Sequence, residues 1–80
     1  MKINVLGFKV SDKSEWIEIH GTYAKYGING NAVKEVAATK DRIIGIENLA
    51  LGSFADVCYE PTGYGNKFRI EHITITKGGK

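Results

Sequence analysis

The sequence predicts a mainly β domain, with five strands forming a closed or partly open barrel and a short helical link between strands three and four. Three observations support this fold class. Residues 15–23 alternate apolar and polar side chains, and residues 54–76 form two β-rich runs around a Gly-rich loop. The first and last strands carry apolar residues on both faces, as expected when a sheet closes on itself. At 80 residues the chain makes one domain, expected over 1–77, with a flexible basic tail at 78–80.

The first strand is expected over residues 2–10. Its apolar residues fall in two sets on opposite faces with Gly7 between them, namely Ile3 and Val5, then Leu6, Phe8 and Val10. Such a strand with a central glycine is predicted to be strongly coiled and to serve two parts of a closed sheet.

The second strand is expected over residues 15–23, half-buried in an antiparallel sheet. One face of this strand is apolar, with Ile17, Ile19 and Tyr23. The other face is polar except for the exposed Trp16, and carries Glu18, His20 and Thr22. His20 is interpreted as a solvated strand residue, because no partner for catalysis is evident. The loop 24–31 contains Asn29-Gly30, which is a strong hairpin signal.

Residues 32–40 fit either a short helix capped by Asn31 or a strand paired with the second one. We favour the strand, because isolated helices of this length are marginal and an Asn-Gly turn comes before it. In residues 42–51 the spacing of Ile46 and Leu49 allows one turn of helix, ended by Gly52, as the helical link.

The last two strands are predicted to form a hairpin around residues 61–66, where Pro61 fixes φ and the glycines allow positive φ. Tyr64 lies in this loop. In the final strand the apolar phase changes near Glu71-His72, since Phe68 and Ile70 alternate out of step with Ile73 and Ile75. This change implies a β-bulge or a strand that changes partners.

Composition narrows the function classes. With 42% hydrophobic and 25% charged residues the chain is an ordinary globular protein, and a net charge of +2 permits nucleic-acid binding without requiring it. The single Cys58 excludes an internal disulfide and favours a cytoplasmic setting. We expect no membrane segment, because no apolar run approaches about 20 residues. The two histidines lie far apart, so no metal site or cofactor is predicted, and no catalytic motif indicates an enzyme or a small-molecule substrate.

The order of elements resembles a five-stranded OB-fold, with an SH3-like barrel as the alternative. The segments 51–57, 63–65 and 68–70 (LGSFADV, GYG and FRI), with Tyr59 and a tyrosine-bearing loop after the second strand, are similar to small OB-fold single-stranded-DNA-binding proteins of bacteriophages and mobile elements, including the filamentous-phage group. The resemblance covers about half the chain. It implies sequence-nonspecific binding of single-stranded DNA, in phage or mobile-element DNA replication.

Single-strand binders combine aromatic platforms with a basic groove. The candidate platforms are Trp16, Tyr23, Tyr26 and Tyr64, and the candidate phosphate contacts are Lys25, Lys34, Lys67 and Arg69. Tyr59 and Phe54 are assigned to the core instead. The expected partners are single-stranded DNA, with RNA as a possibility left open, and a second copy in a homodimer. The alternative function is a small protein-interaction module that binds no nucleic acid.

Overall fold

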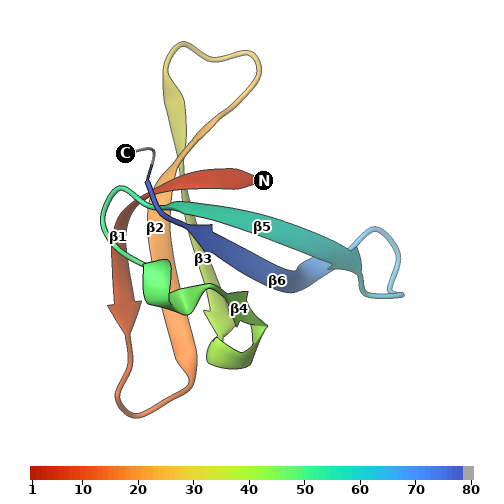
Figure 1. Cartoon of the computed structure of the whole chain (residues 1–80). Helices are drawn as coiled ribbons and strands as arrows, with labels where there is room; N and C mark the ends of the chain where they lie inside the picture. Colours follow the sequence, from red (N-terminus) through yellow and green to blue (C-terminus); the bar gives the residue numbers. More distant parts are fainter. Residues whose placement is uncertain (79–80) are drawn as a thin grey trace.

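The computed structural model describes residues 1–78, which form one six-stranded sheet with the order β3-β2-β1-β5-β6-β4. Two long hairpins, β2–β3 and β5–β6, project from a shared body in different directions (Figure 1). The elements are β1 (Lys2–Val10), β2 (Trp16–Ala24), β3 (Asn31–Thr39), η1 (Lys40–Arg42), β4 (Ile43–Ile44), η2 (Ile46–Asn48), β5 (Phe54–Pro61) and β6 (Phe68–Thr76). The β-rich class predicted from the sequence is confirmed.

The sheet has six strands instead of the five predicted, and it is not closed. Strands β1, β2 and β3 form an antiparallel meander, and β5 and β6 form an antiparallel hairpin. The two parts are joined at Lys2–Asn4 of β1, which pair with β5. The additional strand β4 runs parallel to β6, with Ile43 opposite Ile73. β3 and β4 are the two edge strands of the sheet, and along the chain only η1 separates them.

The predicted helical link is wrong as an α-helix. Between β3 and β5 the chain makes two single-turn 3₁₀ helices, and Ile43 and Ile44 are extended because they pair with β6. Gly45 precedes η2 with a left-handed φ of 77° and interrupts any continuous helix. Too few residues remain for a stable α-helix, which needs roughly 12–15 when isolated.

The strand favoured for residues 32–40 is confirmed as β3, which pairs with β2 along its whole length. The loop between these strands is longer than an Asn-Gly turn, because β2 ends at Ala24 and β3 begins at Asn31. At the other end of the chain, Gly78 packs against the carbonyl of Gly52. Residues 79–80 of the predicted tail lie outside the described part of the chain.

Two β-bulges realign the apolar residues of the first and last strands. In β1 the register shifts between Val5 and Gly7, so that Phe8 and Val10 lie opposite the inward-facing Ile19 and Ile17. The predicted placement of Phe8 and Val10 on the other face from Val5 is therefore wrong. In β6 the register skips Glu71, so Ile70 and Ile73 face the same side. The bulge predicted from the change of phase near Glu71-His72 is confirmed.

The core is a single apolar layer on the inner face of the bent sheet. Its fully buried members come from four of the six strands, with isoleucine the commonest residue. The other two strands, β3 and β4, add Val36, Ala38 and Ile43, which are buried with 3–7% exposure. Among residues 1–78 the buried core residues are Ile3, Val5, Ile17, Ile19, Val36, Ala38, Ile43, Ala55, Val57, Ile73 and Ile75. Phe54 and Tyr59 are outside it, which corrects their assignment to the core.

Gly21 of β2 is paired with Val5 of the neighbouring strand β1. It is buried, and a Cβ atom placed on it would collide with the backbone carbonyl of Asn4 and the side chain of Ile3. Only a glycine therefore allows the two strands to approach this closely. Gly7 lies on the partner strand β1, but a Cβ atom there would meet no described atom within 4 Å.

Replacing Gly21 by alanine should lower the free energy of unfolding by about 1–3 kcal/mol, because the new methyl group overpacks against a rigid backbone oxygen. Urea denaturation followed by circular dichroism measures this loss. The matched control is Gly7→Ala, which should change stability by only about 0.5 kcal/mol. Equal effects of the two substitutions would contradict the proposed close approach.

Candidate nucleic-acid interface

An open seam runs between β3 and β6. Strand β3 pairs with β2 alone, and β6 pairs with β4 only at Ile73 and Thr74. The first part of β6, from Phe68 onward, thus has β5 on one side and no strand on the other within residues 1–78. Two hollows lie along this seam, each lined by residues of both strands.

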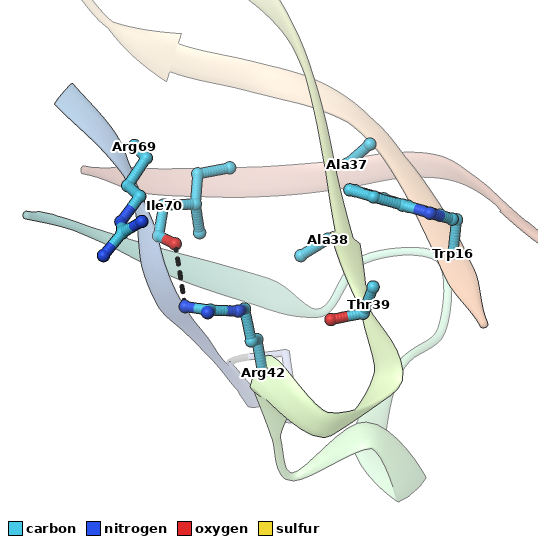
Figure 2. A pocket seen from close by; sticks show the side chains of 7 residues that line it. All are labelled: Trp16, Ala37, Ala38, Thr39, Arg42, Arg69 and Ile70. Carbon is cyan, nitrogen blue, oxygen red and sulfur yellow. Dashed lines mark hydrogen bonds between the residues drawn. The ribbon is translucent and has the colours of Figure 1, made fainter. Parts of the chain in front are cut away.

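The first hollow, of about 340 Å³, lies between the end of β3 and the start of β6. Figure 2 shows Trp16 on one side, beside Ala37, and the two guanidinium groups of Arg42 and Arg69 on the other. Trp16 is 55% exposed, so a ligand in the hollow can reach it. The lining residues are Trp16, Ala37, Ala38, Thr39, Arg42, Arg69 and Ile70.

Arg42 bridges the seam. It comes from η1, and its Nη1 donates to the backbone carbonyls of Glu71 at 3.2 Å and Ile70 at 3.5 Å (Figure 2 draws the latter). These carbonyls belong to the part of β6 that, among residues 1–78, has β5 on one side and no strand on the other, which explains why a side chain satisfies them. The guanidinium has five N–H donors, so most of them stay free for a ligand.

Arg69 lies on β6 opposite Glu60 of β5. Its Nε donates to Glu60 Oε1 at 2.7 Å, and this contact fixes the orientation of the guanidinium. The side chain of Arg69 remains largely exposed. An exposed ion pair of this kind contributes little to stability, but it holds the cation beside the hollow.

The second hollow, of about 510 Å³, continues the seam toward the tip of the β5–β6 hairpin. Lys34 of β3 lies four residues before Ala38, and Phe68 of β6 lies two residues before Ile70, so both strands pass from one hollow to the other. Phe68 is 66% exposed and Tyr59 is 42% exposed. Met1, Lys34, Tyr59 and Phe68 together line it.

Three of the predicted site residues meet at the seam, namely Trp16, Lys34 and Arg69. The others lie elsewhere. Tyr23 lines a separate hollow with Lys2 and Phe54. Lys25 and Tyr26 are in the β2–β3 loop, and Tyr64 and Lys67 are in the β5–β6 loop. These two loops are at the ends of hairpins that point in different directions (Figure 1), so the tyrosines do not share one hollow with Trp16.

The β5–β6 loop is nonetheless ordered by its own side chains. Thr62 Oγ1 accepts the N–H of Tyr64 and donates to the carbonyl of Lys67, both at 3.2 Å. Gly63 and Gly65 adopt the positive φ predicted for them, at 85° and 62°. The loop therefore presents Tyr64 from a defined turn, just beyond the second hollow.

Arg42, Tyr59 and Phe68 were not predicted as site residues. Arg42 belongs to a polar corner whose position depends on η1, and nothing in the sequence indicates that it faces β6. Tyr59 and Phe68 occupy the same alternating positions as buried residues of their strands, such as Val57. For Tyr59 this alternation predicted a place in the core. The available signal was their place at the hairpin end of their strands, beyond the reach of the core.

Comparison with known proteins identifies no relative, since no family model, curated protein or solved structure matches this chain. Among the described residues, no helix is long and apolar enough to cross a membrane.

Proposed function

We propose that this protein binds single-stranded nucleic acid, with DNA as the expected form, along the seam between β3 and β6. The observation that carries the proposal is the first hollow, which combines an accessible indole with two arginine side chains. This is the pairing of aromatic platform and cation that nonspecific single-strand binders use. No cofactor is required for such binding.

The second hollow supports the same path. A base that stacks on an aromatic side chain contributes about 1–3 kcal/mol, whatever its sequence. Phe68 and Tyr59 offer exposed rings at this end of the seam, while Lys34 offers an ammonium group to a phosphate. A strand laid along the seam would meet cations in both hollows and rings at both ends. Tyr64 and Lys67 would extend this path at the hairpin loop.

We also propose that the fold is an open relative of the OB-fold. The support is the order of pairings, with a three-strand meander, a β1–β5 junction, a β5–β6 hairpin and a parallel contact between the β3–β4 segment and β6. OB-folds are partly open barrels that bind oligonucleotides on one side. The homodimer and the role in phage or mobile-element DNA replication remain proposals that rest on the sequence resemblance and on the small size of the domain.

One observation favours the alternative of a protein-interaction module. Several large apolar side chains are more than half exposed at places away from the seam, among them Leu6 of β1 and Leu51. Aromatic and apolar groups are typical of protein interfaces. Salt dependence separates the two functions, because phosphate contacts weaken with salt and an apolar interface does not.

Removing one seam arginine should weaken DNA binding and its dependence on salt. For Arg69→Ala or Arg42→Ala, the slope of log K against log salt should fall by about 0.7, the value for one phosphate contact on a single strand. Fluorescence anisotropy with labelled oligo-dT at several salt concentrations measures it. Lys77→Ala is the charge-matched control, since Lys77 lines a hollow away from the seam, beside Gly52 and Gly78.

Two results would overturn the nucleic-acid proposal. One is the absence of binding at tens of micromolar protein (~10⁻⁵ M), the usual range of nonspecific affinity. The other is an equal loss for Lys77→Ala and the two arginine variants, which would indicate general charge attraction without a path along the seam. Thermal unfolding of each variant checks that the fold is kept.

Replacing Phe68 by alanine should reduce the affinity for oligo-dT about tenfold, by loss of one stacked base of about 1–3 kcal/mol. The control is Leu51→Ala, which removes a similarly exposed apolar side chain, 71% against 66%, at a position away from the seam. The same anisotropy titration gives both affinities. If Leu51→Ala costs as much as Phe68→Ala, stacking at the second hollow is wrong.

A further inference from the structure

Three side chains with metal-ligating groups lie together on the outer face of the β2–β3 ribbon, away from the core. Glu18 and His20 are two residues apart in β2 and so share a face, and Glu35 of β3 is paired in register with His20. One ligand atom from each side chain lies within 4.8 Å of the other two. The backbone pairing of two strands therefore holds the three groups together.

The imidazole lies between the two carboxylates. His20 Nε2 is 2.6 Å from Glu18 Oε1, and His20 Nδ1 is 3.5 Å from Glu35 Oε1. In a tetrahedral zinc site with bonds of 2.0–2.1 Å, neighbouring ligand atoms are about 3.3 Å apart. One ion can bind only one of the two ring nitrogens. Since one ligand atom of each side chain lies within 4.8 Å of the other two, rotations of these exposed side chains bring all three onto one ion.

The charges of the cluster are not balanced by the protein. Among residues 1–78, the only ion-pair partner of Glu18 or Glu35 within 4.0 Å is His20. Lys9 is opposite Glu18 in the β1–β2 register, yet it makes no such pair. One imidazole carries at most one positive charge against two carboxylates. A divalent cation would supply the missing charge.

We propose that Glu18, His20 and Glu35 form a binding site for a divalent transition-metal ion of the Zn²⁺ type, completed by water. The histidine nitrogen selects this class over Mg²⁺ and Ca²⁺, which prefer oxygen ligands alone. One ring nitrogen binds the ion, and the other is left to donate a hydrogen bond, the arrangement that orients metal-binding histidines. The prediction of no metal site considered only the histidines and the cysteine. The carboxylates of Glu18 and Glu35 were not considered, because strand pairing brings them to His20 only in the folded sheet.

The only tryptophan reports on this site. Trp16 is two residues before Glu18 on the same face of β2, and both line one surface hollow. The experiment titrates the full chain, without an affinity tag, with Cu²⁺ and follows quenching of Trp16 fluorescence. Zn²⁺, which does not quench, is then added as a competitor, and its binding is measured independently by isothermal titration calorimetry.

The expected result is saturable quenching by Cu²⁺ that Zn²⁺ reverses, with one Zn²⁺ per chain in the calorimeter. His20→Ala and Glu35→Gln should each lower the Zn²⁺ affinity about tenfold or more. The matched control is His72→Ala, because His72 is another half-buried strand histidine but has one carboxylate neighbour, Glu71, at 3.0 Å. All positions are at the surface, and circular dichroism checks that each variant folds.

The proposal is overturned if the calorimeter shows no Zn²⁺ binding up to millimolar metal. It is equally overturned if His72→Ala lowers the affinity as much as His20→Ala, since the site would then lie elsewhere. Neither result depends on nucleic-acid binding, so this inference and the proposed function stand or fail separately.

Discussion

The structure depends on keeping one apolar layer continuous beneath a sheet that bends sharply. β1 is shared by both parts of the sheet, pairing with β5 through Lys2–Asn4 and with β2 from Asn4 to Val10. Where a strand bends and its register shifts by one residue, all following side chains turn to the opposite face of the sheet. The bulges at Leu6 and Glu71 absorb this shift. Without them, the layer that joins Ile3 and Ile73 would be broken.

The same bend leaves the seam between β3 and β6 open. The chain leaves β3 through η1 and reaches β6 only as the two-residue β4, so pairing begins at Ile73 and not earlier. The inner face of the exposed stretch is therefore lined by Lys34, Phe68 and Tyr59 instead of by buried isoleucines. An inward lysine on the edge strand β3 also discourages pairing with another chain. The seam is thus kept open as a surface groove by the residues that line it.

The regular parts of the fold could be predicted from the sequence, because periodicity and turn residues determine them locally. The limits of β1, the buried face of Ile17 and Ile19, and the bulge near Glu71 follow from the order of apolar residues alone. The two-residue β4 could not be predicted, since its pairing partner is about 30 residues away. For the site, Trp16, Lys34 and Arg69 were found by residue type. Arg42 and Phe68 depend on the seam, which exists only in the folded sheet.

Under the proposed function, the distribution of acidic residues would confine a polynucleotide to the seam. Glu18 and Glu35 lie on the strands that would carry a nucleic-acid surface, but alternation turns them to the outer face, opposite Lys34 and Ala38. Their negative charges would repel a phosphate backbone, whereas Arg42 and Arg69 at the first hollow would attract it. Trp16, at the start of β2, lines hollows on both sides of this boundary. The proposed metal ligands and the proposed phosphate contacts are different side chains. Under the two proposals, a cation and a nucleic acid would therefore not compete for the same charged groups.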